Sequence, residues 1–283
     1  MNIDFLKYTE ILPHASLKGM VTHYRIKSAQ LSGPFVFANF SPIFQGLIFN
    51  IRPLDDINFV KKETVDLKHK VYFVGQAISS STLVSSSLNV DLIAVNFTPT
   101  GVFRLTGIDL DSFTDQIVDA ETIFGTEINQ LHEQLIAAKD QSTALRLIDN
   151  YLYLKAAKRK KENKSHILES VSILKNNAAG ISVKMLQKAT NTSPSTLERS
   201  FKSEIGMTPK MYQRLLRFNQ ARQYIDENHC TDWWEIVVLF AFYDQSHFIS
   251  EFRFFAGQTP MQYLQTISFQ AAIAPGPQSR MLA

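Results

Sequence analysis

The apolar positions of the chain follow two different periods, one before and one after about residue 110. Between residues 20 and 105 they form short runs rich in β-branched and aromatic residues, such as Phe35–Phe37, Leu47–Ile51, Val71–Val74 and Leu92–Phe97. Gly, Pro, Ser and Asp residues separate these runs. Short strands at near-regular spacing are typical of an antiparallel barrel or sandwich. We therefore expect a β-rich domain in the N-terminal half of the chain.

After residue 110 the apolar spacing becomes helical. Ile128, Leu131 and Leu135 form one stripe, and residues 144–152 carry a second. The sequence therefore predicts two amphipathic helices that end a domain spanning residues 1–155. Stripes of this kind pack on the sheet of their own domain or pair across a dimer, and the first use is favoured.

Positive charge is concentrated directly after this domain. Between residues 155 and 164 six basic residues stand against the single carboxylate of Glu162, and they are Lys155, Lys158, Arg159, Lys160, Lys161 and Lys164. A charge run is usually a solvated linker. The alternative is a basic arm that touches DNA phosphates. Both interpretations place a domain boundary here, with residues 156–165 as the linker.

Helical spacing continues through residues 166–267, and residues 268–283 are expected to form a flexible tail. Helix starts are marked by side chains that can cap the first turn, and these are Ser182, Ser193, Asp232 and Asp244. Pro194 stands at the first position of its helix, where proline is preferred. Thr208-Pro209 opens a helix of about 19 residues, which spans about 28 Å at 1.5 Å per residue. This part of the chain is predicted to be all-α.

A twelve-residue phrase occurs twice in the helical part. Residues 201–212 return as residues 252–263, with a Phe, a basic residue, a Gly, a Thr, a Pro and a Tyr all offset by 51 positions. Such a repeat indicates a duplicated supersecondary unit. Each copy ends a helix–turn–helix, at 182–204 and 234–256, and this arrangement places its second helix in the major groove of DNA. The long connecting helix could set the two recognition helices near one DNA repeat apart, roughly 34 Å.

The two copies resemble the AraC/XylS family of bacterial transcription regulators. Asp244–Arg253 followed by Gly257–Tyr263 is similar to the C-terminal signature of that family, and Ser193–Lys202 followed by residues 206–209 is similar to its first unit. The resemblance covers roughly residues 165–267, and residues 97–107 are the best match to a β-rich domain that some members carry. It implies sequence-specific DNA binding and regulation of transcription. It also names RNA polymerase, a small-molecule effector and a second copy of the chain as candidate partners.

Three positions depart from the family pattern. Ala241 and Asn191 stand in the two turns where Gly is usual. A left-handed backbone would cost Ala about 1 kcal/mol, which predicts a slightly reshaped second turn, whereas Asn tolerates that conformation. Ser250 stands where many members carry Arg, which weakens base reading by the second unit.

The candidate DNA-binding residues lie on the outer faces of the two recognition helices. They are Ser195, Thr196, Glu198, Arg199 and Lys202 in the first helix, and Gln245, Ser246, His247, Ser250 and Arg253 in the second. Arg199 can bond guanine bidentately, and Glu198 can accept from cytosine N4. Lys202 and Arg253 lie one turn further on and suit phosphate contacts. The alternatives are ordinary surface ion pairs for Arg199 and Glu198, and a half-buried structural role for His247.

Composition narrows the remaining classes of function. The chain has 283 residues, is 45% apolar and 19% charged, and carries a net charge of +3, which suits two globular domains. One cysteine, Cys230, suits a reducing cytoplasm, and we expect no signal peptide and no membrane span. His14, His23 and His69 are scattered and no phosphate loop is present, so we expect no metal, no cofactor and no enzymatic activity.

Three classes of function compete for this chain. The first is a ligand-responsive regulator that reads DNA with both units. The second is a constitutive dimeric regulator whose N-terminal domain is structural only. The third and least favoured is a β-barrel enzyme fused to a DNA-binding module.

Overall fold

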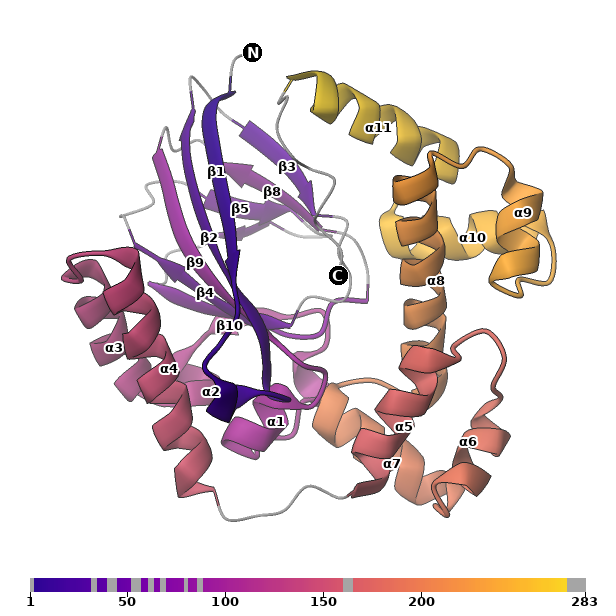
Figure 1. The fold of residues 1–283 in the computed structure, drawn as a ribbon, viewed down its shortest axis with the longest axis horizontal. Helices are drawn as coiled ribbons and strands as arrows, with labels where there is room; N and C mark the ends of the chain where they lie inside the picture. Colours follow the sequence, from indigo (N-terminus) through magenta and orange to yellow (C-terminus); the bar gives the residue numbers. More distant parts are fainter. Residues whose placement is uncertain are drawn as a thin grey trace.

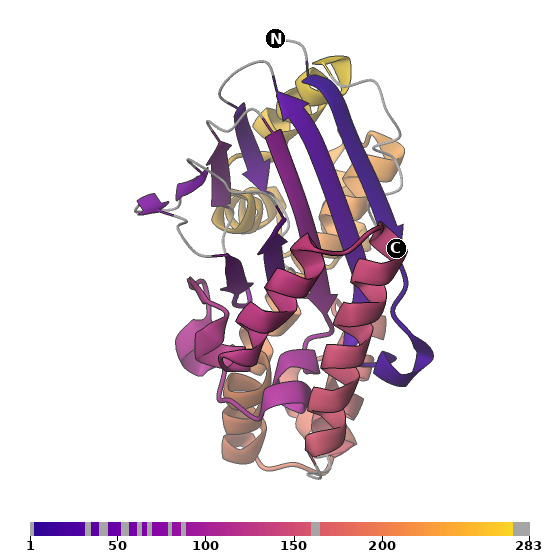
Figure 2. The ribbon, with the colours of Figure 1, turned by 90° about the vertical axis from the view of Figure 1, so that its left-hand side faces the viewer.

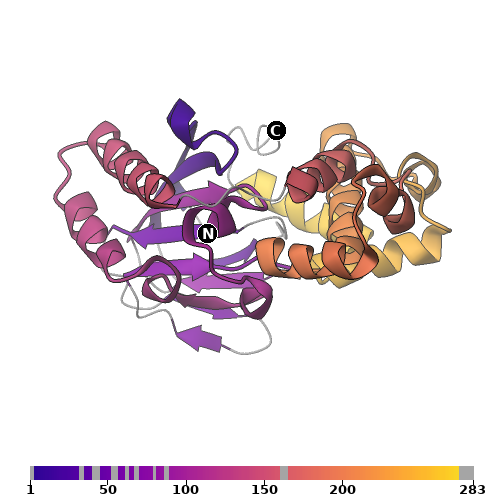
Figure 3. The ribbon, with the colours of Figure 1, turned by 90° about the horizontal axis from the view of Figure 1, so that it is seen from below.

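A computed structural model of the chain describes residues 3–31, 35–39, 45–51, 57–60, 64–66, 70–78, 81–85, 89–159 and 165–273. A β-rich domain and an all-helical domain lie side by side, at the left and right of Figure 1. The view from below in Figure 3 separates the same two bodies. The predicted fold class, a β-rich domain followed by an all-α domain, is confirmed.

Two antiparallel sheets form the β-rich domain. Its strands are β1 (Ile3–Ile11), β2 (Val21–Leu31), β3 (Phe35–Asn39), β4 (Gly46–Asn50), β5 (Ile57–Val60), β6 (Thr64–Asp66), β7 (Val71–Val74), β8 (Ser81–Ser85), β9 (Asn89–Phe97) and β10 (Ile117–Asp119). One sheet has the order β1-β2-β9-β4-β7-β10 and the other the order β3-β8-β5-β6. The four apolar runs named above are the strands β3, β4, β7 and β9. Strands β1 and β10 lie outside the region predicted to be β-rich, and β10 pairs with β7 through Ile117 and Val74.

Helices cover one face of the larger sheet. They are α1 (Gly101–Thr106), α2 (Glu121–Phe124), α3 (Glu127–Ile136) and α4 (Gln141–Lys158), with two 3-10 turns, η1 (Ala15–Leu17) and η2 (Asp111–Phe113). Figure 2 shows α3 and α4 in front of the long strands. The predicted stripes, including Leu131 and Ile148, are buried in one core with the strand residues Tyr24 and Ile26. The apolar stripes of both helices therefore pack against the sheet of their own domain.

The linker and tail differ from the boundaries that the sequence suggested. Helix α4 continues to Lys158, because Ala156 and Ala157 are strong helix formers and extend it into the predicted linker. Residues 160–164 of the predicted basic arm lie outside the described residues. Helix α11 (Pro260–Ile273) continues six residues beyond the predicted end at 267. The rest of the predicted tail, 274–283, also lies outside the described residues.

The helical domain contains two helix–turn–helix units joined by one long helix. Its helices before α11 are α5 (Ser165–Asn176), α6 (Val183–Ala189), α7 (Pro194–Ile205), α8 (Pro209–Asn228), α9 (Trp233–Leu239) and α10 (Gln245–Ala256). The four predicted N-caps and Thr208 all accept a backbone N–H from the first turn of their helices. Helix α8 joins the lower unit to the upper one in Figure 1. Its 20 residues correspond to about 30 Å of helix.

The sequence repeat is also a repeat of contacts. Phe201 packs against Tyr212 with 5.9 Å between ring centroids, and Phe252 packs against Tyr263 at 5.4 Å. Both recognition helices end on a left-handed glycine. Phe218 of α8 contacts the ring of Phe252 at 5.1 Å. Helix α8 is therefore the shared spine on which both units pack.

The β-rich domain holds the end of the first recognition helix. The backbone N–H of Leu110 donates to the carbonyl of Ser203 at 2.9 Å, and the Thr114 hydroxyl donates to the carbonyl of Gly206. Gly206 has a φ of +92°, and a Cβ at this position would lie 2.8 Å from the Thr114 hydroxyl. Two features therefore require glycine at position 206: its left-handed backbone conformation and the close approach of the η2 segment.

No helix in the described part of the chain is both long and apolar enough to cross a membrane.

Candidate nucleic-acid interface

Helix α7 presents the first group of candidate residues to solvent. Ser193 caps it and Pro194 occupies its first position, while Leu197 and Phe201 turn inward with no exposed area. This register leaves Ser195, Glu198 and Arg199 exposed, with Thr196 and Lys202 half-buried beside them. Among the described residues, none forms an ion pair or hydrogen bond with the Arg199 guanidinium. The structure thus brings the five candidates of the first unit onto one open face.

An ion pair joins two of these candidates. The Lys202 ammonium lies 3.1 Å from a carboxylate oxygen of Glu198, one turn away. Exposed pairs at this spacing contribute only about 0.3–0.5 kcal/mol. The pair can therefore open at small cost and leave both side chains available to a ligand.

Helix α10 presents a less charged face. Gln245, Ser246, Ser250 and Arg253 are exposed. Ile249, which stands at the position equivalent to Glu198, is half-buried and packs against the helical core. Arg253 is thus the one cation among the five candidates of this helix. The charged side chains on the open faces of the two recognition helices are therefore concentrated in the first unit.

His247 stabilises the start of α10. The Nδ1 atom of His247 accepts the backbone N–H of Tyr243 at 3.1 Å, and its ring packs edge-on against Phe242. The backbone N–H of His247 donates to the side chain of Asp244, the helix cap. These contacts give His247 the structural role that the sequence left open. The opposite ring nitrogen, Nε2, has no hydrogen-bond partner among the described residues.

The turns of both units contain a left-handed residue that is not glycine. Asn191 has a φ of 47° in the first turn, and Ala241 has a φ of 50° in the second. The expectation that the second turn is reshaped is wrong, because Ala241 keeps the left-handed backbone. Arg217 of α8 helps to hold it there, since its guanidinium donates to the Ala241 carbonyl at 3.2 Å and lies 4.9 Å from the Phe242 ring centroid.

Ala241→Gly is expected to stabilise the protein by about 0.5–1 kcal/mol, because it removes the left-handed strain of Ala at the expense of a more flexible unfolded chain. Urea unfolding followed by tryptophan fluorescence measures the change. Asn191→Gly is the matched control, and we expect it to change the free energy of unfolding by less, since Asn tolerates this conformation. Equal effects of the two substitutions, or destabilisation by Ala241→Gly, would contradict a strained turn.

A partly buried ion pair fastens α10 to α8. The Arg214 guanidinium donates to both carboxylate oxygens of Glu251, at 2.9 and 2.7 Å, and lies 4.9 Å from the Phe254 ring centroid. Nearby, burial lowers the pKa of Arg217, and the carboxylate of Glu251 opposes that shift. The bidentate geometry fixes the angle at which α10 leaves the spine.

A second buried cluster lies behind α11. The Tyr263 hydroxyl donates to Asp226 at 2.7 Å, and Arg222 pairs with the other oxygen of the same carboxylate at 3.1 Å. Burial raises the pKa of Asp226, and Arg222 opposes that shift. Together the two clusters hold the second unit rigidly on the spine.

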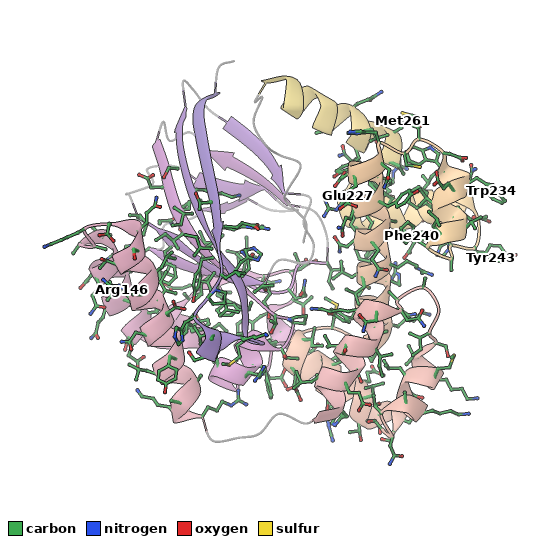
Figure 4. All side chains as sticks on the ribbon, viewed as in Figure 1. Arg146, Glu227, Trp234, Phe240, Tyr243 and Met261 are labelled. Carbon is green, nitrogen blue, oxygen red and sulfur yellow. The ribbon has the colours of Figure 1, made fainter. Side chains whose placement is uncertain are left out.

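Exposed aromatic residues that the sequence did not assign to the interface lie beside the second unit. Tyr243 is 89% exposed directly before α10, and Trp234 on α9 is 55% exposed. Both stand at the outer edge of the helical domain, away from the β-rich domain (Figure 4). Tyr243 directly precedes the Asp244 cap, so its position in the turn was the available signal for its exposure.

Within the residues that the structure describes, no group of three or more His, Cys, Asp or Glu side chains could hold a metal ion. His69 lies outside the described residues.

Two protein families match separate parts of the chain. Residues 186–266 match a family described as a helix-turn-helix domain, of the AraC type, and residues 9–119 match a domain of unknown function, DUF6597. The first match contains α7, α8 and α10 entirely. No curated protein matches the chain.

Solved structures with a similar arrangement include ToxT from Vibrio cholerae, at 10% identity and a TM-score of 0.47, covering 87% of this chain and 97% of that one. Wild-type ToxT bound to an unsaturated fatty acid is similar at 13% identity and a TM-score of 0.47, over 85% and 94% of the two chains. The AraC-like transcriptional activator CuxR is similar at 12% identity and a TM-score of 0.32, over 77% and 80%.

Proposed function

We propose that this chain, an AraC-type DNA-binding transcription regulator with a β-rich N-terminal domain, reads two successive major grooves with α7 and α10. The observation that carries this is the pair of helix–turn–helix units packed on one helix of 20 residues. A rod of about 30 Å separates the units by close to the roughly 34 Å between successive grooves on one face of DNA. A small bend in the DNA makes up the difference.

The two helix–turn–helix units have different roles in DNA binding. Arg199 and Glu198 offer charged, directional groups for base edges in the first groove. Ser250 offers a hydroxyl in the second groove, and Arg253 offers a phosphate anchor there. The preference for particular DNA sequences therefore depends mainly on α7, whereas α10 fixes the position of the protein on DNA and increases its affinity.

Selection of bound fragments from random DNA by the full-length protein tests this function. We expect a motif with two elements about 10–10.5 base pairs apart, the first more sharply defined than the second. A selection that enriches no motif, or one confined to a single groove, would remove the two-groove assignment.

Affinity for the selected site is expected to fall steeply with salt. Two phosphate contacts, from Lys202 and Arg253, give a slope of about −1.8 in log K against log salt, or about tenfold between 50 and 200 mM. Fluorescence anisotropy with a labelled selected site measures the slope. A scrambled duplex of equal length is the control, and we expect weaker binding there with a comparable slope. Affinity that does not change with salt would contradict phosphate anchoring.

Control by the N-terminal domain is supported by its contact with α7. The bonds from Leu110 and Thr114 reach the last turn of the helix that carries Arg199. A change in the β-rich domain, such as the binding of a small molecule, can therefore reach the DNA-reading face through a single segment. This favours a ligand-responsive regulator over one whose N-terminal domain is structural only.

Dimerisation through the N-terminal domain is part of the same proposal, but its basis is narrower than the sequence suggested. The apolar stripes of α3 and α4 are buried within the domain, which leaves Ile136 and Tyr153 among the exposed apolar side chains of these helices. We expect light scattering to show a dimer at tens of micromolar, the usual order for a weak interface. Tyr153→Glu is expected to shift it toward monomer. A wild-type monomer at that concentration would remove the dimer.

A further inference from the structure

A pocket opens on the side of the β-rich domain, between α1, α2 and the end of α4. Its volume is about 530 Å³, within the range of pockets that hold small organic ligands. Leu105, Ile123 and Phe124 form a buried apolar floor, and the half-exposed Leu154 stands among the lining residues. In Figure 1 the three helices converge below the sheet, at the end of the domain nearer to α7. We call this the α1–α4 pocket.

Cations outnumber carboxylates in the lining of the α1–α4 pocket. Lys155, Lys158 and Arg159 all line it, and Glu127 is the one carboxylate among the lining residues. The Lys155 ammonium donates to the Phe124 carbonyl and lies 5.8 Å from the Phe124 ring centroid. The Glu127 pKa is lowered, chiefly by a backbone hydrogen bond and then by Lys155. The lining therefore keeps a positive excess above an apolar floor.

Arg159 has hydrogen-bonding capacity that the described residues do not use. Its guanidinium lies 4.7 Å from the Phe103 ring centroid, and one of its terminal nitrogens is buried with no hydrogen-bond partner among the described residues. A Cβ on Gly107 would approach the guanidinium carbon to 2.9 Å, so a side chain there would crowd it. A buried guanidinium N–H without an acceptor is costly, and an incoming oxyanion would supply the acceptor.

We propose that the α1–α4 pocket binds a compact organic carboxylate, with its apolar body against the half-exposed Leu154 above the apolar floor and its headgroup on Arg159 and the neighbouring lysines. Arginine suits this role because its planar fork matches the two oxygens of a carboxylate. The apolar floor selects against small inorganic anions, which gain nothing from it.

Arg159 also connects this pocket to the DNA-reading helix. Burial lowers its pKa, and the carboxylate of Glu204, which is buried on α7, opposes that shift. The Arg159 guanidinium lies over the Phe103 ring of α1, and α1 packs against α7. A carboxylate bound to Arg159 therefore adds negative charge near Glu204 and alters the surroundings of α7. This second step rests on the proposed function, whereas the binding site itself does not.

Calorimetry on the full-length protein tests the site without DNA. Cyclohexaneacetate is the probe, and its neutral amide is the matched control for shape. We expect saturable binding of the acid with a Kd near or below about 1 mM, and at least about tenfold weaker binding of the amide. Inorganic sulfate at equal concentration should not compete. Equal binding of acid and amide, full displacement by sulfate, or no binding of the acid at about 5 mM would each overturn the site.

Substitutions locate the binding. Arg159→Gln is expected to weaken binding of the acid by about tenfold or more, and Arg159→Lys by less, because the charge stays and the fork is lost. Lys139→Gln, an exposed cation between α3 and α4, is the control and should leave affinity unchanged. If Arg159→Gln proves unstable by its thermal midpoint, Lys155→Gln serves the same purpose. Unchanged affinity in a folded Arg159 or Lys155 variant, or loss in Lys139→Gln, would overturn the assignment.

A final measurement separates the site from its effect on DNA. Affinity for the selected DNA site is compared with and without saturating cyclohexaneacetate, in the wild type and in Glu204→Gln. We expect the probe to change wild-type affinity at least threefold and to change the variant less. A probe that binds but leaves DNA affinity unchanged overturns the connection through Arg159. A protein that binds the probe but selects no DNA overturns the proposed function and leaves the site standing.

Discussion

Replacing Arg199 with Ala is expected to weaken binding to the best selected site by about 1–3 kcal/mol and to relax the preference at one base pair. The reason is geometric, because Arg199 is exposed on the outer face of α7 and no described residue pairs with it. Its guanidinium is therefore free to form two hydrogen bonds with one guanine. Repeating the binding-site selection on the variant measures the loss of preference directly.

Arg253→Ala should behave differently from Arg199→Ala. It is expected to weaken all DNA sequences about equally and to lower the salt slope by about one ion, because a phosphate contact carries no sequence information. Arg146→Ala is the matched control, since Arg146 is an exposed arginine on the far side of the β-rich domain (Figure 4). It should change neither motif nor slope. If Arg199→Ala keeps the motif while Arg253→Ala rewrites it, the assigned roles of the two residues are wrong.

Glu251→Ala is expected to lower the free energy of unfolding by about 2–3 kcal/mol, less than the roughly 3–5 kcal/mol usual for one partner of a fully buried pair, because the Arg214 side chain is 27% exposed. The substitution leaves the partly buried Arg214 guanidinium without the two acceptors that it now bonds at 2.9 and 2.7 Å. Urea unfolding measured by tryptophan fluorescence reports on the same unit, because Trp233 packs against Phe248.

Two further variants decide what the Glu251→Ala result means. Glu227→Ala removes an exposed carboxylate from α8 and should change stability by less than about 0.5 kcal/mol. The double variant Arg214→Met with Glu251→Leu should recover most of the loss, because apolar residues of similar volume replace a buried pair at little cost. A small effect of Glu251→Ala alone would show that the pair does not fasten α10 to the spine.

Local features of the helical domain could be predicted from the sequence because each depends on neighbouring residues. The side-chain oxygens of Ser193 and Asp244 accept backbone N–H groups only three residues further along the chain, so short spacing identifies these caps. The inward register of Leu197 and Phe201 follows from a spacing of four. The same register placed Arg199 on the open face.

Features that depend on distant contacts could not be predicted in this way. From the sequence, a left-handed backbone at Ala241 is expected to be unfavourable. The hydrogen bond from Arg217, 24 residues away in the chain, supports this conformation and could not be predicted from neighbouring residues. The contact of Thr114 with Gly206 joins residues 92 positions apart. For the stripes of α3 and α4 the sequence favoured packing on their own sheet but left pairing across a dimer open, because periodicity shows that a face is apolar without showing what covers it.

The contact between η2 and the end of α7 has a consequence for transplanting domains. A chimaera of two-domain regulators is usually made by joining the domains of two proteins at the linker. In this protein such a junction would separate the helical domain from residues 110–114, which would stay with the N-terminal domain. The last turn of α7 would then meet a foreign surface at Gly206, where the fit admits no side chain. A hybrid that carries its own 110–114 segment along with the helical domain would keep the matched surfaces together. The unit of exchange in this molecule is thus discontinuous in sequence, although its linker suggests a simple junction.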